Sequence, residues 1–243
     1  MNTVLLIARR ELGAYLRTMS GYIIIAVLLF LDGLAFNAFA VAGTAKKSSE
    51  VLGDPLGFFF WTSGIGMAVA IFLSMRLIAE ERQTGTLQLL YSSPVHDREI
   101  VLGKYLASLG FLCIFLLATG YMPLLVGIYG KVSLGHVLSG YLGLVLVGSA
   151  SIAIGIFGSA LTKSQVVAAI SSGVMSVALT MCWILAKVVD RPFTDVITGL
   201  AWYGHFDPFA HGLVHLKHVV YFGLVTFVAL FAATRVLEAR RWR

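Results

Sequence analysis

Few residues in this chain could do chemistry, and the most unusual of them is an aspartate surrounded by apolar sequence. Asp32 is the one charged residue in an apolar run that is long enough to cross a membrane. A carboxylate inside a membrane is costly, so it faces a bundle interior or a water path and is a functional candidate. Asp32 and Asn37, which follows in the same run, are therefore candidates for a transport pathway. A neutral or paired aspartate near the outer interface is the alternative.

Histidines near the end of the chain raise the question of a metal site. His211, His215 and His218 would share a face if one helix ran through them, and imidazoles one helical turn apart can bind zinc. Asp207 is the only nearby acid that could complete the set. We therefore expect ordinary surface histidines and no metal.

The two cysteines predict neither a disulfide nor a thiolate site. Cys113 and Cys182 each lie within a long apolar stretch, as is typical of buried thiols. The sequence also lacks the phosphate-binding pattern G-x-x-x-x-G-K-[ST] and the alternation of strands and helices that would hold it. We expect no catalytic residue and no cofactor on this chain.

The composition is that of a membrane protein. Of the 243 residues, 58% are hydrophobic and 12% are charged, whereas soluble domains carry about 25% charged residues. The formal net charge of +6 could suggest nucleic acid as a partner. The basic residues flank apolar segments instead of forming one face, so we expect no nucleic-acid binding.

The apolar runs predict one membrane domain over 1–243, an all-α protein with six transmembrane helices. A bilayer core of about 30 Å requires about 20 helical residues. The elements around the predicted spans are an N-terminal helix, a loop helix between the second and third spans, short broken helices on the outer side before the sixth span, and a tail. The predicted spans are 21–43, 55–77, 94–127, 136–162, 164–187 and 217–236, and the other elements are 1–20, 80–92, 190–215 and 237–243.

The basic residues also fix the orientation. An even number of spans puts both termini on one side, and the segments on that side hold twelve of the eighteen lysines and arginines. The positive-inside rule therefore places both termini in the cytoplasm.

The first twenty residues predict a helix that lies on the membrane surface. At 100° per residue, an apolar arc lies opposite an arc that includes Arg9, Arg10 and Arg17. This pattern is typical of an interfacial helix with arginines toward anionic lipid headgroups. A cytosolic helix packed on a partner is the alternative. The apolar arc consists of Val4, Leu5, Ala8, Leu12, Tyr15, Leu16 and Met19.

The loop between the second and third spans is the most informative stretch. Thr84 or Thr86 can cap a short helix in which Leu87, Leu90 and Tyr91 share one face, and Ser93-Pro94 can begin the next helix. An apolar ridge of this kind can dock into a groove on a soluble partner or lie on lipid. The neighbouring acids disfavour an anionic membrane, so docking is preferred.

Four motifs in the same order resemble those of type-2 ABC-exporter permeases, in particular the gliding-motility permease (F subunit) type. They are Glu81-Arg82-x-x-Gly85-Thr86-Leu87 with Ser92-Ser93-Pro94, then Glu99-Ile100-Val101-Leu102-Gly103-Lys104, then His205-Phe206-Asp207-Pro208-Phe209, and finally Leu237-Glu238-Ala239-Arg240-Arg241-Trp242. The resemblance implies a type V ABC-exporter-like fold, with an amphipathic elbow helix, a cytoplasmic coupling helix and outer re-entrant helices.

The resemblance also implies partners and roles. A permease of this family would export substrate across the bacterial inner membrane. It would pair with a second copy or a sister permease, contact lipids, and dock on ABC-type ATPases that bind ATP and Mg. His205, Asp207 and Pro208 would belong to the outer re-entrant motif. The coupling positions would be Glu80, Glu81, Arg82, Gly85, Thr86, Leu87, Leu90 and Pro94.

Two other functions fit a six-span protein. An ion- or proton-coupled carrier would be expected to hold several intramembrane charges or an inverted repeat. A membrane anchor or assembly factor would not need a docking helix in the loop.

Overall fold

The computed structural model describes residues 3–37, 55–83, 96–124, 134–187 and 193–241. Every regular element in these ranges is helical, which confirms the all-α class. The elements are α1 (Thr3–Arg17), α2 (Met19–Phe36), α3 (Pro55–Gln83), α5 (Asp97–Thr119), α7 (Leu134–Leu161), α8 (Gln165–Leu185), α9 (Phe193–Leu200), α10 (Trp202–Ala210) and α11 (Leu216–Arg241).

Among the described residues, five helices are long and apolar enough to cross a membrane: α3, α5, α7, α8 and α11. A sixth span results if α1 and α2, which meet at a bend of 72°, are counted together. The described part of α2 ends soon after Phe36, which leaves it short of a full span by itself. Five or six spans agree with the six that the sequence predicts.

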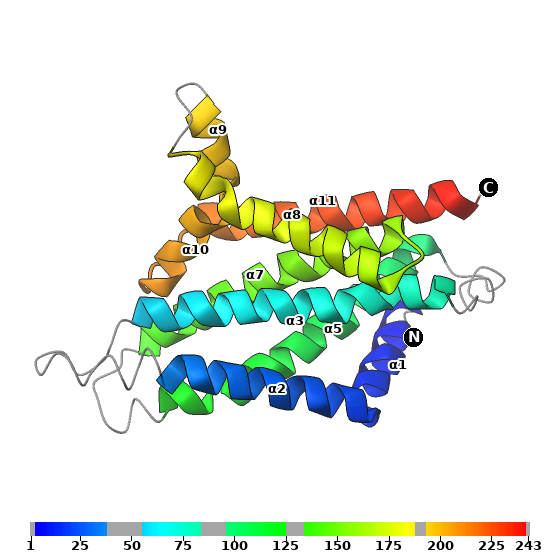
Figure 1. Ribbon diagram of the computed structural model, residues 1–243, viewed down its shortest axis with the longest axis horizontal. Helices are drawn as coiled ribbons and strands as arrows, with labels where there is room; N and C mark the ends of the chain where they lie inside the picture. Colours follow the sequence, from blue (N-terminus) through cyan, green and yellow to red (C-terminus); the bar gives the residue numbers. More distant parts are fainter. Residues whose placement is uncertain (1–2, 38–54, 84–95, 125–133, 188–192, 242–243) are drawn as a thin grey trace, which may run out of the picture.

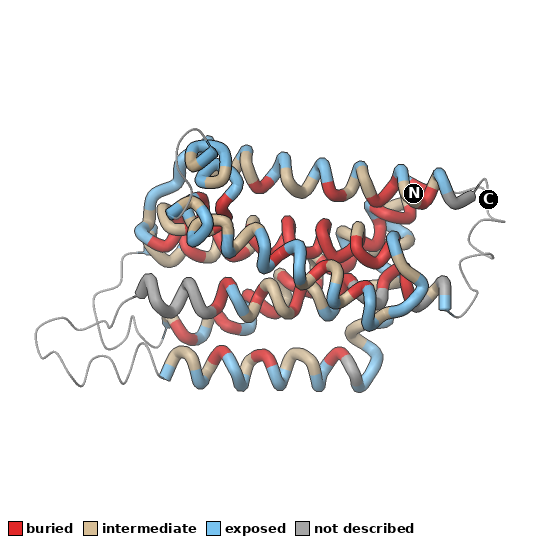
Figure 2. Tube along the Cα trace, turned by 45° about the horizontal axis from the view of Figure 1, so that its top comes forward, coloured by how far each residue is buried: buried red, intermediate tan, exposed pale blue. Residues whose placement is uncertain are grey.

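α7 lies at the centre of the bundle, in contact with α3, α5, α8, α10 and α11. Its sequence contains Gly148, Gly155 and Gly158 among serines and alanines, and small residues let helices in a membrane approach closely. In α7, 78% of the segment that could cross the membrane is buried inside the protein, whereas the corresponding shares in α8 and α11 are 17% and 22%. Figure 2 shows the buried residues gathered inside the bundle. α8 and α11 therefore leave apolar faces open to lipid or to a partner.

The two ends of the bundle differ. Figure 1 shows both termini at one end, where α3 also ends and α5 begins. The short helices α9 and α10 lie at the opposite end, before α11 begins. The sequence-based orientation makes the first end cytoplasmic.

α1 turns into α2 because Thr18 between them is extended, with φ −91° and ψ 141°. α1 packs on the bundle with a face slightly different from the predicted apolar arc. Leu12 and Tyr15 pack against the core, but Leu5 and Met19 are 59% and 84% exposed. One side of the arc therefore packs on α5, which contacts Ile7 at the backbone of Gly103, and the placement of α1 on the membrane surface stays a prediction.

Candidate coupling site

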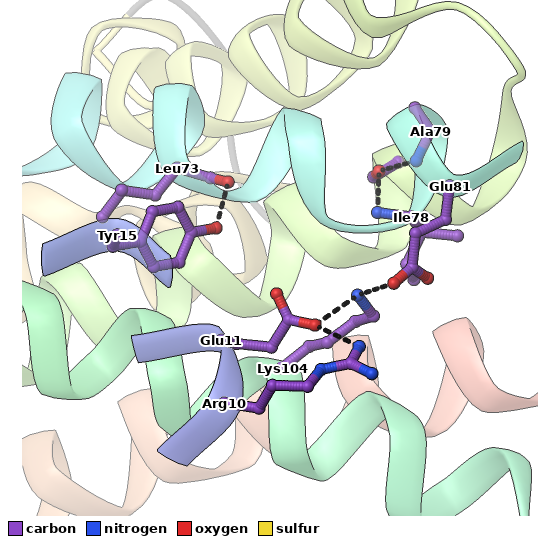
Figure 3. Close-up of polar contacts among 9 residues, drawn as sticks. Arg10, Glu11, Tyr15, Leu73, Ile78, Ala79, Glu81 and Lys104 are labelled. Atoms are coloured by element: carbon purple, nitrogen blue, oxygen red, sulfur yellow. Dashed lines mark hydrogen bonds and ion pairs between the residues drawn. The ribbon is translucent and has the colours of Figure 1, made fainter. Parts of the chain in front are cut away.

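A buried lysine joins three helices at the end of the bundle that holds both termini. The ammonium group of Lys104 on α5 lies 2.7 Å from Oε1 of Glu81, near the end of α3, and 3.5 Å from Oε1 of Glu11 on α1. The Lys104 side chain is 2% exposed, and the two carboxylates are 18% and 17% exposed. Figure 3 shows the lysine between the two acids, with Arg10 directed at the same oxygen of Glu11 as Lys104.

The exposed Arg10 shares the charge of Glu11, because its Nη2 lies 2.9 Å from Oε1 of Glu11. Positive and negative side chains thus alternate along the cluster, which runs from Arg10 through Glu11 and Lys104 to Glu81. A buried charge is tolerated when it is paired and hydrogen-bonded, and removing one partner of a buried pair is strongly destabilising. The cluster therefore fixes the end of α3 relative to α1 and α5.

A second contact joins α1 to the first turn of α5. Oε1 of Glu99 accepts a hydrogen bond of 2.7 Å from the Thr3 hydroxyl. Oε2 of the same carboxylate accepts the backbone N–H of His96 at 3.1 Å. The second bond is half of a capping box, in which the residue at the helix start and the acid three positions later bond each other's N–H groups. The start of α5 is thereby fixed to the start of α1.

Between these two contacts, α1 lies directly on α5. A Cβ at Gly103 would lie 2.7 Å from the Ile7 side chain and 3.1 Å from the Val4 carbonyl oxygen, so only glycine allows this approach. Tyr15 stacks obliquely near Phe111 at 5.5 Å between ring centroids. Its hydroxyl also reaches the Leu73 carbonyl of α3 at 3.4 Å. α1 therefore contacts both helices that flank 84–95.

The end of α11 joins the same end of the bundle. Glu238 lies 3.1 Å from Arg235 on its own helix and 3.8 Å from Arg98 on α5. All three side chains are at least one third exposed, and exposed ion pairs contribute little to stability. Glu238 belongs to the tail motif on which the sequence resemblance rests, and it lies next to the first turn of α5.

The structure places one predicted coupling residue inside this cluster. Glu81 is bound by Lys104, a partner that the sequence did not suggest for it. α3 continues to Gln83, and the backbone at Glu80 and Arg82 belongs to that helix. The other predicted coupling residues lie outside the described residues: Gly85, Thr86, Leu87, Leu90 and Pro94.

Asp32 and Asn37 occupy different environments. Asp32 is fully buried and accepts a hydrogen bond of 2.8 Å from the hydroxyl of Thr62 on α3. Asn37 is exposed at the end of α2. The structure therefore shows an aspartate hydrogen-bonded between two helices, and a role in a pathway stays a prediction.

At the opposite end, His205 ties α10 to α11. Its Nε2 lies 3.0 Å from the Gly199 carbonyl oxygen, and its Nδ1 lies 2.8 Å from Nδ1 of His218. The ring stacks on Tyr221 with 3.9 Å between centroids. Burial lowers the pKa of His205, the bond to Gly199 opposes this effect, and the charge of Lys217 adds to it.

The other two residues of this motif have separate positions. Asp207 lies 3.5 Å from Nδ1 of His211, and Pro208 lies within α10. The prediction of one helical face shared by His211, His215 and His218 is wrong. Gly212 has φ +81° and ends the first helix, and α11 begins only at Leu216. Among the described residues, no group of three or more His, Cys, Asp or Glu side chains could hold a metal.

Comparison with known proteins identifies the family. The model of the family described as "ABC-2 family transporter protein" matches residues 5–195, which is well over half of the chain. The chain belongs to the ABC-2 transporter family. It is a multi-pass membrane permease of an ABC transporter, and members of this family are membrane components without catalytic activity of their own. No curated protein is significantly similar to it.

The ABC-2 match covers the cluster around Lys104 and the start of α5, but not Thr3 and Val4 or the end of α11. Sequence reasoning missed Glu11 and Lys104 as a pair. A signal was present, because Glu11 is the only acid before Asp32, and Lys104 is the last charge before a long apolar run. Lys104 was instead counted among the cytoplasmic basic residues that set the orientation.

Proposed function

We propose that this permease couples ATP hydrolysis on a separate ATP-binding-cassette subunit to export across the bacterial inner membrane. The observation that carries the proposal is the family match over residues 5–195. The sequence supplies the second argument, because it lacks a phosphate-binding loop of its own. ATP and Mg would then be held by the partner.

The segment 84–95 is the proposed docking element, and the described residues on either side of it support this role. Glu81 before the segment is joined to Glu11 of α1 through Lys104, and Glu99 after the segment is joined to Thr3 of α1. A displacement of the segment would thus be passed to α1 at two points, its start and its middle.

From α1 the displacement would reach the membrane. α1 continues through the bend at Thr18 into α2, whose inner face carries Asp32 bonded to Thr62 of α3. Movement of rigid helices about such joints is a common way to open a pathway on alternate sides. In this proposal Asp32 and Asn37 line or border the pathway.

The exposed apolar faces favour assembly with a second permease. α8 presents large apolar side chains outward, among them Val166, Ile170, Val174 and Met181. A pore shared by two subunits, either two copies or one copy with a sister permease, would cover part of this face. Exposed Arg9, Arg10 and Arg17 on α1 would face anionic lipid headgroups. The motif with His205, Asp207 and Pro208 would lie at the outer mouth, in the re-entrant position.

The test is co-expression of the tagged chain with an ABC-type ATPase subunit from the same source, followed by purification in mild detergent. We expect the ATPase to co-purify and its ATP hydrolysis to differ from that of the isolated subunit. Leu87→Asp should abolish this difference and reduce co-purification. Leu213→Asp, which changes an exposed leucine at the other end of the molecule, should leave both unchanged.

Two results would overturn the proposal. One is a purified, functional complex that contains no ATPase, as expected for an ion-coupled carrier or an anchor. The other is equal ATP hydrolysis with Leu87→Asp and with the unaltered chain.

A further inference from the structure

The second membrane span has an unusual contact just before it reaches Glu81. Within α3, the backbone N–H groups of Ile78 and Ala79 both donate to the hydroxyl oxygen of Ser159 on α7, at 3.2 and 2.9 Å. Figure 3 shows the two nitrogens directed at one oxygen. All three residues are fully buried. A serine oxygen has two lone pairs, so it can accept both donors.

This contact adds a second acceptor to an otherwise continuous helix. An N–H group inside an α-helix normally donates to the carbonyl four residues earlier. Here two successive N–H groups also reach a side chain of another helix, and a side chain inserted into the ladder is a recognised cause of helix bending.

The turn of α3 before Ile78 carries a further side-chain contact. The hydroxyl of Ser74 donates to the Ala70 carbonyl at 2.6 Å and lies 3.2 Å from that of Ile71. Serines that bond back to their own helix in this way often bend it. Opposite Ser74, a Cβ at Gly155 would overlap the serine side chain, so α3 and α7 are in close contact one turn away from Ser159.

The turn at Ile78 and Ala79 separates two parts of α3 with different neighbours. Before it, Val69, Ala70, Leu73 and Ser74 are buried in the bundle. After it, Glu81 is held by Lys104 of α5 and, through the lysine, by α1. One part of α3 thus belongs to the membrane core, and the other belongs to the coupling site.

We propose that the turn at Ile78 and Ala79 is a pivot in the second span, and that Ser159 is the positioning residue that holds it. Ser159 supplies an acceptor for N–H groups that the helix releases when its last turns change direction. This inference rests on the proposed function, because the coupling cycle supplies the motion. The inference adds the place where α3 would bend and the buried serine of α7 that would hold this turn.

Spin-label distances can test the pivot in the complex with the ATPase. The background chain has Cys113 and Cys182 replaced by alanine, and one labelled copy is mixed with an excess of unlabelled chain. One label pair joins Gln83→Cys to Leu224→Cys on α11, and the control pair joins Phe72→Cys to Leu224→Cys. Gln83, Phe72 and Leu224 are all exposed. ATP trapping should shift the first distance and leave the second unchanged.

Variants of the serine identify what holds the turn. Ser159→Ala should remove the ATP-dependent shift of the Gln83 pair and the effect of the permease on ATP hydrolysis. Ser159→Thr, which keeps the hydroxyl oxygen, should retain both. Ser159→Cys, which keeps an acceptor atom but adds a thiol that could be labelled, is used for ATP hydrolysis alone and should retain that effect. Ser151→Ala is the matched control, because this buried serine of α7 donates to the Val147 carbonyl of its own helix.

The pivot is refuted if both label pairs shift equally, if neither shifts, or if Ser159→Ala retains the shift. Failure of the proposed function is separate, because it is seen as loss of ATPase binding. If the ATPase does not bind, the Gln83–Leu224 distance is measured in the isolated chain, without ATP. A changed Gln83 distance in Ser159→Ala but not in Ser151→Ala supports the pivot, and an unchanged distance overturns it.

Discussion

Lys104 holds two carboxylates of different helices with almost no access to water. Its cost of desolvation is balanced only while both acids are present, since burying an unpaired charge costs several kcal/mol. This makes the site sensitive to the loss of charge on either side. It also explains why the lysine cannot simply extend to the surface, as lysines at the ends of membrane helices commonly do.

Replacing Lys104 by alanine should therefore destabilise the chain by about 3–5 kcal/mol, because Glu81 and Glu11 would remain without their shared cation. Unfolding by SDS in mixed micelles measures this loss. The double variant Lys104→Met with Glu81→Leu should recover most of it, while Glu11 keeps Arg10. Arg9→Ala on the exposed face of α1 is the control. Equal stability of Lys104→Ala and the unaltered chain would contradict the assigned role.

His205 predicts a pH dependence at the outer end. Burial lowers the pKa of His205 in the folded chain, whereas the unfolded chain has the ordinary value of about 6.5. The unfolded state then binds more protons, so stability is full above pH of about 6.5 and falls as the pH drops toward the folded pKa.

The thermal midpoint of the unaltered chain should therefore fall more between pH 7 and pH 5 than that of His205→Gln. His211→Gln, which changes an exposed histidine on the same side, should keep the slope of the unaltered chain. Parallel curves for His205→Gln and the unaltered chain would show that His205 is not the group responsible.

At the scale of elements, the packing of α1 on α5 depends on one position without a side chain. Gly103→Ala should lower stability by about 1–3 kcal/mol, the usual cost of an overpacked contact, because the added carbon meets Ile7 and the Val4 carbonyl oxygen. Gly223→Ala in α11 is the matched control, since nothing lies within 4 Å of its added carbon. The control should be neutral or slightly stabilising.

Thermal unfolding in one detergent gives both values, and the rate of proteolysis within α1 shows which helix detaches. Faster cleavage of α1 in Gly103→Ala alone is the expected result. Equal behaviour of the two variants would mean that α1 does not depend on this contact.

The sequence predicts elements better than contacts. Apolar runs of span length give the helices, because membrane crossing imposes length and hydrophobicity on each segment separately. The cluster around Lys104 could not be predicted in this way, because Glu11, Glu81 and Lys104 come from three distant segments. The packing of α1 has the same origin: periodicity defines its apolar face, but the neighbouring helix decides which side of that face is covered.

At the scale of the whole molecule, the orientation can be tested with single cysteines. Gln83→Cys lies at the end that holds both termini, and Val196→Cys lies on α9 at the opposite end. In intact cells, a membrane-impermeant maleimide should label Val196→Cys and not Gln83→Cys. Permeabilised cells should give labelling of both. The reverse pattern would place the coupling site outside and would exclude docking of a cytosolic ATPase.

Both chain ends lie at the end of the bundle where α3 ends and α5 begins. A fluorescent protein or a large affinity domain fused to either terminus would consequently occupy the space from which a soluble subunit has to approach. Such fusions could produce an apparently partnerless protein by steric hindrance alone. A short peptide tag on a flexible spacer avoids this outcome, and it is the appropriate format for isolating the intact transporter.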